Sequence, residues 1–217
     1  MNEIISVTCF TEAMFGENAF VVAAKGHGGV WVIDPSFEPQ ARQIRAHVAD
    51  QGKVVEAVIL THGHVDHIAG VDVVLAGLPE ARLWIAAEDA EMLGDPQANL
   101  SAPFGMAVCV EARPTDLLDA GTVLTLGPTQ WVALDTSGHS PGGRSLYCAE
   151  AGIVFTGDAL FAGSIGRTDF PGSEHSRLIE NIRTELLSLP GDTQVLSGHG
   201  PATTVQKERM SNPFVAE

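Results

Sequence analysis

Short apolar runs bounded by turn residues fill the first third of the chain and predict β-strands. We expect strands at residues 4–10, 18–24, 30–34 and 54–60. The segment 25–29, Lys-Gly-His-Gly-Gly, lies between the second and third runs and is typical of a hairpin turn. The fourth run is almost continuously apolar, which predicts a strand that is covered on both faces.

Helical periodicity separates these runs. Between 37 and 50 the apolar residues recur every three to four positions, which predicts a helix with one buried face. Similar reasoning predicts helices at 67–76, 87–93, 174–189 and 204–210. Thr203 and Gln206 are placed as in a capping box at the start of the last helix. We expect the segment 94–114 to be a loop.

The second half of the chain repeats the alternation of strands and helices. Further strands are expected at 82–86, 122–126, 130–135, 143–149, 153–155 and 194–196. Two successive halves, each with strands and flanking helices, favour an α/β (α+β) fold in which two stacked sheets carry helices on their outer faces. The 217 residues, 45% of them hydrophobic, contain no linker or low-complexity segment, so we expect one domain over residues 1–217.

Charge and composition narrow the expected partners and location. The chain has 12 Lys and Arg residues against 27 Asp and Glu, a net charge of −15 that repels phosphate backbones and anionic lipid surfaces. We therefore expect neither nucleic acid nor a membrane as partner. The start of the chain lacks the pattern of a secretory signal, and no stretch approaches the roughly 18 apolar residues of a membrane span. A cytoplasmic location is the resulting expectation.

The three cysteines, Cys9, Cys109 and Cys148, show no CxxC spacing. They therefore predict neither a disulfide framework nor a zinc site built from thiolates. We expect all three to be small buried residues.

Histidines gather where the expected strands end. Five of the eight histidines follow strand-like runs and have glycines nearby, and side chains at strand ends can converge. The densest segment is 61–67, Thr-His-Gly-His-Val-Asp-His, with four potential ligands in the six residues 62–67. Imidazoles two residues apart can point to the same side, and Asp66 and His67 can face a second point. Two ions about 3.5–4 Å apart would each find ligands here.

Three more candidate ligands follow later strand-like runs: His139 in Ser-Gly-His-Ser-Pro-Gly, Asp158 in Phe-Thr-Gly-Asp, and His199 in Ser-Gly-His-Gly. Seven nitrogen or carboxylate ligands exceed what one closed structural zinc ion requires. The sequence therefore predicts two divalent metal ions, with zinc first and iron or manganese as alternatives.

The HxHxDH motif at 62–67, with the later His139, Asp158 and His199 in that order, resembles the metallo-β-lactamase superfamily over nearly the whole chain. The resemblance implies a four-layer αββα sandwich with the site along one edge. It also implies a first metal held by His62, His64 and His139, a second held by Asp66, His67 and His199, and Asp158 bridging both.

Other segments look like the glyoxalase II and persulfide dioxygenase branch of this superfamily, namely Gly-Asp-Ala-Leu-Phe at 157–161 and Gly-Arg-Thr-Asp-Phe at 166–170. The tail segments 198–204 and 212–214 are similar to compact bacterial glyoxalase II-like hydrolases. Only one short helix fits after His199, so we expect no C-terminal helical substrate-binding domain. Asp158 stands where many β-lactamases of the superfamily carry Cys, which disfavours β-lactam substrates.

Thioester hydrolysis is the leading functional hypothesis, with S-D-lactoylglutathione or a related acyl-thiol as substrate. Two metal ions would make a bridging water a hydroxide near neutral pH, and Asp66 and Asp158 would be the catalytic carboxylates. A thiolate leaving group needs little protonation, and no separate acid is evident. The alternatives are an iron-dependent persulfide dioxygenase that uses His62, His139 and Asp158, and a non-catalytic metal-binding protein.

Arg167 matches a position where glyoxalase II enzymes place a basic residue that contacts the peptide part of the substrate. An ion pair with Asp169 is the alternative role. Asp34 resembles a family aspartate that orients a metal ligand, with turn capping as its alternative. Arg144 is a weaker candidate for substrate contact and is expected at the surface. The remaining histidines are also expected at the surface: His27, His47 and His175.

Overall fold

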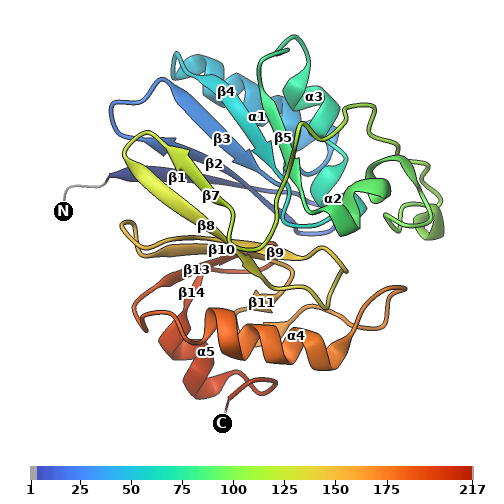
Figure 1. Ribbon diagram of the computed structural model, residues 1–217. Coiled ribbons are helices and arrows are strands. Elements are labelled where there is room, and N and C mark those ends of the chain that lie inside the picture. The colour runs from blue at the N-terminus through green and yellow to red at the C-terminus, as the bar shows by residue number, and fades with distance from the viewer. Residues whose placement is uncertain (1–3, 217) are drawn as a thin grey trace.

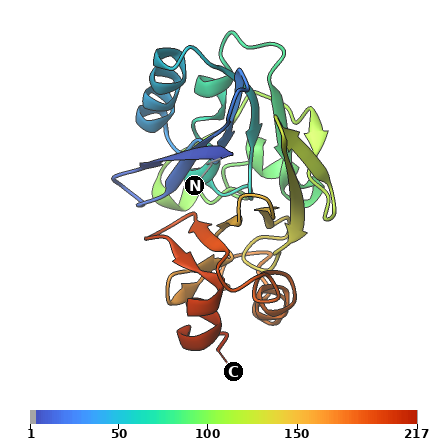
Figure 2. The same cartoon turned by 90° about the vertical axis from the view of Figure 1, so that its left-hand side faces the viewer.

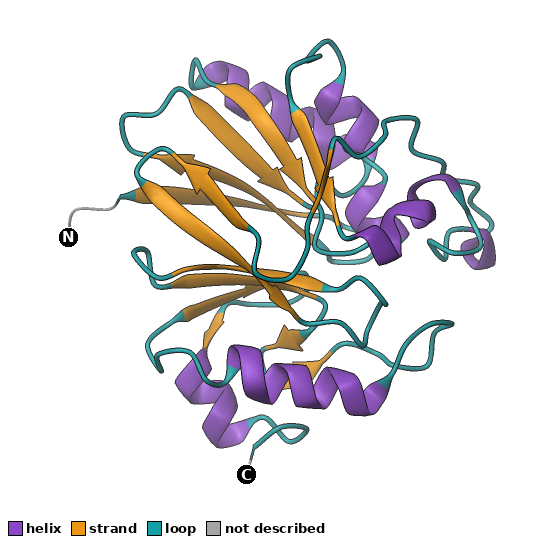
Figure 3. Cartoon of the chain, viewed as in Figure 1, coloured by secondary structure: helices purple, strands orange, loops and turns teal. Residues whose placement is uncertain are grey.

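Two six-stranded mixed sheets lie face to face, and helices cover the outer side of each (Figures 1 and 3). This computed structural model describes residues 4–216. The first sheet and its helices come from residues 5–117, and the second sheet and its helices come from residues 123–211, as the turned view in Figure 2 shows. The αββα sandwich expected from the sequence is confirmed.

The first sheet has the strand order β1-β2-β3-β4-β5-β6. Its first three strands pair antiparallel, and β3 to β6 pair parallel. The predicted β2–β3 hairpin is confirmed. The strands are β1 (Ile5–Thr11), β2 (Asn18–Ala24), β3 (Gly29–Ile33), β4 (Val54–Ile59), β5 (Arg82–Ile85) and β6 (Asp116–Leu117).

The second sheet has the strand order β14-β13-β10-β9-β8-β7. Only β10 and β13 pair parallel, and the other neighbours pair antiparallel. The strands are β7 (Val123–Leu126), β8 (Thr129–Asp135), β9 (Arg144–Cys148), β10 (Ile153–Gly157), β13 (Gln194–Ser197) and β14 (Thr203–Thr204). Two further short strands, β11 (Leu160–Phe161) and β12 (Ser164–Ile165), form a separate hairpin.

The helices lie on the two outer faces of the sandwich and in the connecting loops (Figure 3). Those of the first half are α1 (Glu38–Asp50), α2 (Val65–Ile68), α3 (Val71–Leu75) and the 3₁₀ segments η1 (Ala87–Gly94) and η2 (Ala102–Phe104). Those of the second half are α4 (His175–Asn181), which continues as the π-helical η3 (Ile182–Leu186), and α5 (Val205–Ser211). Within residues 4–216, every helix is too short or too polar to cross a lipid bilayer.

Alternating side chains of the strands fill three apolar layers. In β3, Val30 and Val32 pack toward α1 and α3, whereas Trp31 and Ile33 pack between the sheets. In β10, Val154 packs toward α4 and α5, and Phe155 joins the layer between the sheets. Each strand that is buried on both faces packs into two of these layers, so its position is fixed from both sides. The loops that follow the strands therefore start from fixed points.

The helix predicted at 67–76 is wrong, because the structure has two short helices, α2 and α3, with a break at Gly70. A Cβ atom at Gly70 would lie 2.6 Å from the carbonyl oxygen of Pro35 and 2.7 Å from Cβ of Ala41. The chain therefore passes too close to α1 at this point for any residue with a side chain. That tertiary contact is not visible in the local hydrophobic pattern.

Three other helix predictions need correction. The helix predicted at 87–93 is the 3₁₀ segment η1, and the one predicted at 174–189 divides into α4 and η3. The capping box at Thr203 and Gln206 is wrong. Thr203 belongs to β14 and donates its hydroxyl hydrogen to Glu208, and Thr204 is the cap, accepting a hydrogen bond from the backbone N–H of Lys207.

The cysteine prediction is correct only in part. Cys148 is fully buried in the apolar layer between the sheets, but Cys9 and Cys109 are exposed. Cys9 lies on the edge strand β1, where alternate side chains face away from the core.

Candidate metal centre

Four strands deliver the predicted ligands to one edge of the sandwich. His62 and His64 follow β4, His139 follows β8, Asp158 follows β10, and His199 follows β13. Strands β8, β10 and β13 run in the same direction, because β9 is antiparallel to both β8 and β10 and β10 is parallel to β13. Their carboxyl ends therefore meet at the same edge, as side chains at the ends of parallel strands do.

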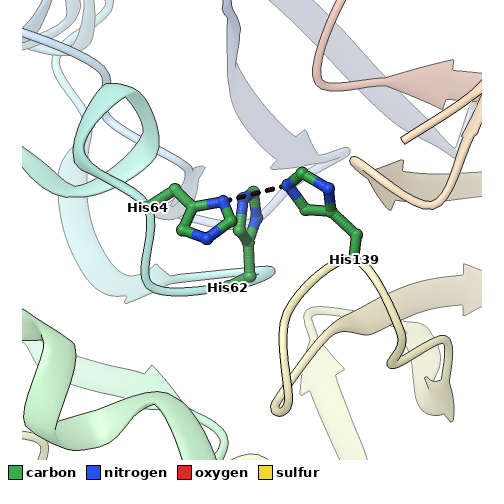
Figure 4. Close-up of side chains that lie close together, drawn as sticks. All are labelled: His62, His64 and His139. Carbon is green, nitrogen blue, oxygen red and sulfur yellow. Dashed lines mark hydrogen bonds between the residues drawn. The ribbon is translucent and has the colours of Figure 1, made fainter. Parts of the chain in front are cut away.

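The first cluster consists of His62, His64 and His139, whose three rings converge from two loops in Figure 4. One ligand nitrogen from each residue lies within 4.8 Å of the others. Nδ1 of His64 is 2.9 Å from Nε2 of His139, and the rings of His62 and His139 have their centroids 5.0 Å apart. All three side chains are buried.

The second cluster consists of Asp66, His67 and His199, again with ligand atoms within 4.8 Å of one another. Nε2 of His199 is 3.3 Å from Oδ2 of Asp66. His67 is fully buried, whereas the side chains of Asp66 and His199 are 16% and 25% exposed. This cluster therefore opens toward solvent more than the first one does.

Asp158 lies between the two clusters and contacts both. Its Oδ2 is 3.5 Å from Nε2 of His139 in the first cluster and 3.5 Å from Nε2 of His199 in the second. Its Oδ1 is 3.3 Å from Nε2 of His67. The structure thus brings together all seven side chains that the sequence singled out as ligands.

Three buried ligand atoms have no hydrogen-bond partner among residues 4–216: Nε2 of His62, Nε2 of His67 and Oδ1 of Asp158. Buried polar atoms are normally hydrogen-bonded, so a group of such atoms facing one another needs an explanation. Divalent cations that take imidazole and carboxylate ligands, such as zinc, iron or manganese, would satisfy all three. The residues therefore fit a dinuclear metal site.

Electrostatics differ between the clusters. Burial, reinforced by neighbouring imidazoles, lowers the pKa of His62 well below its usual value and lowers the pKa of His64 to about 3. Both imidazoles are therefore neutral at pH 7. Neutral imidazole is the form that binds a metal.

In the second cluster, burial lowers the pKa of His67, but the carboxylates of Asp158 and Asp66 outweigh it and leave this pKa well above its usual value. For His199, Asp66 likewise outweighs burial and the pKa is raised. Burial raises the pKa of Asp158 and of Asp66, but His67 outweighs it in both, so both pKa values are lowered. Without a metal ion, the carboxylates thus favour the protonated form of both imidazoles, and a bound cation would take the place of these protons.

Asp34 lies directly behind His67. Its Oδ2 is 2.9 Å from Nδ1 of His67, and the same carboxylate accepts hydrogen bonds from the backbone N–H and the hydroxyl of Thr61. These contacts fix the ring of His67 and leave its Nε2 directed at Asp158. Asp34 has a positive φ of 49°, a conformation that Asp and Asn tolerate better than most residues.

Glu17 was not anticipated from the sequence. It is fully buried, and its Oε1 is 3.8 Å from Nδ1 of His67. Burial raises the pKa of Glu17 well above its usual value. A glutamate before an apolar strand carries no local signal of such a position, so only the folded chain reveals it.

Asp89 and Asn18 were also missed, and each fixes loops that carry candidate ligands. Asp89 is buried and accepts hydrogen bonds from the backbone N–H of Gly63, at 3.0 Å, and of Gly142, at 2.6 Å. It thereby connects the loop of His62 and His64 to the loop of His139.

Asn18 donates from Nδ2 to the carbonyl oxygens of Ser197 and Gly200, on either side of His199. Acidic residues inside a 3₁₀ helix and amides at a strand start are common. Sequence alone therefore gives no reason to connect Asp89 or Asn18 with the site.

Arg144 is not at the surface as predicted. Its side chain is 5% exposed, and its guanidinium lies 3.2 Å from Glu88 and 3.3 Å from Asp135. It also donates to the carbonyl oxygens of Leu118 and Gly143. The buried guanidinium is thus fully engaged in holding loops together, and a role in substrate contact is not supported.

A cavity of about 310 Å³ opens above the two clusters. Arg167 lies at its rim, exposed, with its guanidinium paired with Asp169 at 2.9 and 2.7 Å and stacked 4.5 Å above the ring of Phe170. Both roles considered for Arg167 therefore remain compatible with its position. The predicted surface histidines lie away from this cavity: His27, His47 and His175.

A sandwich of this layout with paired histidine and aspartate clusters at one edge defines a class of metal-dependent hydrolases. The chain belongs to the metallo-β-lactamase superfamily, whose family model matches residues 14–199. The match spans both halves of the sandwich and ends at His199, the last of the seven candidate ligands.

The bacterial relatives include proteins whose names describe chemistry. The probable metallo-hydrolase YqgX of Bacillus subtilis is 37% identical over 185 residues, which cover 85% of this chain and 86% of the relative. The hydroxyacylglutathione hydrolase GloC of Haemophilus influenzae is 34% identical over 185 residues, with the same coverage of each chain.

Two solved structures are similar over nearly their whole length. The BLEG-1 B3 metallo-β-lactamase has a TM-score of 0.91 and 31% identity, covering 98% of this chain and 100% of that one. TTHA1623 in a di-iron-bound form has a TM-score of 0.83 and 33% identity, covering 96% and 100%. The protein is accordingly a metal-dependent hydrolase of this superfamily, and its buried clusters are consistent with a dinuclear site.

Proposed function

We propose that the protein hydrolyses a thioester, with S-D-lactoylglutathione as the reference substrate. One observation carries the proposal. Among the described residues that line the cavity, every titratable side chain except Arg167 belongs to the two clusters or is Asp158. A site without a separate acid suits a leaving group that departs as a thiolate, because a thiol with a pKa of about 8.5 needs little protonation.

Two divalent cations held by the clusters would supply an activated water and a Lewis acid for the substrate carbonyl. Residues of the chain set the positions that the two cations would take. Asp158 contacts both clusters and lies between them, while His62 lies on the buried side and His64 and His139 reach the cavity.

Asp66 supplies a charged carboxylate at the floor of the cavity. Its Oδ2, 3.3 Å from His199, can accept a hydrogen bond from water that enters beside the substrate. Arg167 at the rim is the side chain placed to contact an anionic part of the substrate. Hydrolysis then breaks the C–S bond and adds the water oxygen to the acyl carbon. One proton of the water ends on the leaving sulfur and the other is released, so the products are a carboxylate, a thiol and a proton.

The second cluster favours this proposal over the iron-dependent persulfide dioxygenase. A dioxygenase centred on His62, His139 and Asp158 leaves Asp66 and His199 without a function, although both line the cavity. The name of the GloC relative gives independent support for a glutathione thioester.

Thiol release tests the proposal directly. Purified protein loaded with zinc, and in parallel with iron or manganese, is incubated with S-D-lactoylglutathione, and free thiol is measured with a chromogenic reagent. We expect metal-dependent release that a chelator abolishes. No release above background with any of the three metals would contradict the proposal, and oxygen uptake with glutathione persulfide would favour the dioxygenase.

β-Lactam hydrolysis is a second candidate, favoured by the similarity to the BLEG-1 B3 metallo-β-lactamase. Amide cleavage expels an amine, which generally needs a proton donor. Among the lining residues within 4–216, Arg167 is the single titratable group outside the metal centre. A chromogenic cephalosporin assayed beside the thioester separates the two candidates. Faster turnover of the cephalosporin would reverse our order of preference.

A further inference from the structure

The cavity above the clusters has aromatic walls. Its floor is formed by members of the metal centre, but its sides carry four phenylalanine rings, together with Leu100 and Val65. The rings come from three separate parts of the chain, the last of which supplies two: Phe15, Phe104, and Phe161 with Phe170. We call these four residues the aromatic wall.

The rings of the aromatic wall are held in place. Phe15 stacks on Phe37 with centroids 5.5 Å apart, and its ring meets Phe104 edge-on at 5.3 Å. On the other side, Phe170 contacts His64 at 5.6 Å, and Phe161 contacts His199 at 5.8 Å. The wall therefore reaches down to both clusters and extends outward to Phe104.

Phe104 is the most accessible member of the aromatic wall. Its side chain is 59% exposed, a large apolar surface for a residue that edges a cavity. A group bound in the cavity would cover part of this ring and remove it from water, which is favourable in proportion to the apolar area buried.

Positive charge is scarce in the cavity. Among the described lining residues, Arg167 is the single Lys or Arg, and Asp169 already pairs with it. The chain as a whole carries a net charge of −15. Away from the metal centre, side-chain charge therefore gives an anionic group little attraction, whereas a neutral apolar group matches the walls.

Resting on the proposed thioester hydrolysis, we propose that the aromatic wall binds an apolar acyl group, of the size of a single aromatic ring, and that the thiol carrier extends into solvent. The volume of about 310 Å³ lies at the low end for small-molecule pockets, so only the smaller part of a thioester fits inside. The acyl carbon then lies above Asp158 and the C–S bond points outward.

Two thioethers of N-acetylcysteamine, which cannot be hydrolysed, test binding without turnover. One carries a 2-phenylethyl group and the other a 2-hydroxypropyl group that imitates lactoyl, so the carrier is constant. By calorimetry on the metal-loaded protein, we expect the phenylethyl compound to bind about tenfold more tightly. Equal dissociation constants would overturn the assignment of the cavity.

Phe104→Ala tests whether the aromatic wall causes the preference for the phenylethyl compound. Because Phe104 is exposed, the variant is expected to fold, and the affinity for the phenylethyl compound should fall about tenfold while that for the hydroxypropyl compound changes little. Phe214→Ala is the matched control, since Phe214 is also exposed but lies outside the cavity, and we expect a change below about twofold. An unchanged preference in Phe104→Ala would contradict the role of the aromatic wall.

Turnover of the phenylacetyl and lactoyl thioesters of the same thiol separates the two proposals. We expect kcat/KM to be about tenfold higher for phenylacetyl. Hydrolysis of both at equal rates would uphold thioester hydrolysis and overturn the apolar acyl pocket. A binding preference for the phenylethyl compound with no hydrolysis of any thioester would overturn thioester hydrolysis and uphold the apolar pocket.

Discussion

The two clusters at the edge of the sandwich are built from similar side chains but differ in charge and in surroundings. The first contains three buried histidines, of which His62 and His64 are neutral because burial and neighbouring imidazoles lower their pKa values. The second contains the carboxylate of Asp66, has Asp34 and Glu17 behind His67, and is partly open to the cavity.

This difference assigns separate tasks to the two halves of one site. The more buried cluster, in which His62 and His64 are neutral, is suited to hold a cation tightly. The open, acidic cluster places a charged carboxylate next to the substrate. Asp158 couples the two because its carboxylate contacts histidines of both.

The largest expected effect is that of Asp66→Ala, which removes the carboxylate of the second cluster. We expect metal content to fall from two ions to about one and thioester hydrolysis to fall about 10²–10³-fold, comparable to losing one charge-stabilising group in other active sites. Elemental analysis and the thiol-release assay measure both. Asp50→Ala, at the exposed end of α1, is the control.

If Asp66→Ala stays folded and retains full activity toward every ester and thioester, the second cluster has no catalytic task. The protein would then be better described as a metal-binding protein, or as an enzyme that uses the first cluster alone.

Asp34→Asn tests the support of the second cluster. Asn keeps the shape and tolerates the positive φ, but it loses the charge that faces Nδ1 of His67. Replacing such a partner behind a metal ligand typically costs about 10–100-fold in metal affinity or activity. Competition with a chelator should show weaker binding of one ion while the other is retained. If binding of both ions weakened equally, the two clusters would not be supported independently of each other.

Asp89→Asn makes the corresponding test for the first cluster. The carboxylate of Asp89 accepts hydrogen bonds from the backbone N–H groups of Gly63 and Gly142, one on each oxygen. Because Asn has a single side-chain oxygen, one of these two N–H groups would lose its acceptor. A buried donor left unpaired costs about 1–3 kcal/mol, so the free energy of unfolding of the metal-free protein should fall by that amount in urea. Unchanged stability would show that the two loops are held by other contacts.

Arg167→Ala is expected to have the smallest effect. The guanidinium is exposed and already paired with Asp169, and such surface ion pairs contribute little. We expect KM for S-D-lactoylglutathione to rise less than about fivefold with kcat unchanged. A loss of kcat/KM above about 100-fold would contradict this expectation. It would mean that Arg167 is central to binding of the substrate, including its thiol carrier.

Sequence patterns predicted the layers of the fold well and its irregular elements poorly. Runs such as 54–60 are long and apolar, so their strands were evident. The strands β11, β12 and β14 have two residues each, too few for a hydrophobic pattern to show. The break at Gly70 depends on contact with Pro35, and β6 depends on pairing with Trp84 and Ile85 of β5, far earlier in the chain. Local periodicity carries no information about such contacts.

For the site, the seven candidate ligands could be selected because they form compact motifs after strands. Glu17, Asp89 and Asn18 could not, since each acts on a loop or ring that is brought to it only by folding. The aromatic wall was missed for the same reason. Phe15 and Phe170 are separated by most of the chain, and single phenylalanines in loops have no distinctive pattern.

The central claim is that two cations lie between these seven side chains with Asp158 in contact with both. Anomalous X-ray diffraction from crystals of the zinc-loaded protein tests it most directly. We predict two peaks, one beside His62, His64 and His139 and one beside Asp66, His67 and His199, each within bonding distance of Asp158. A single peak, or peaks away from these side chains, would contradict the account.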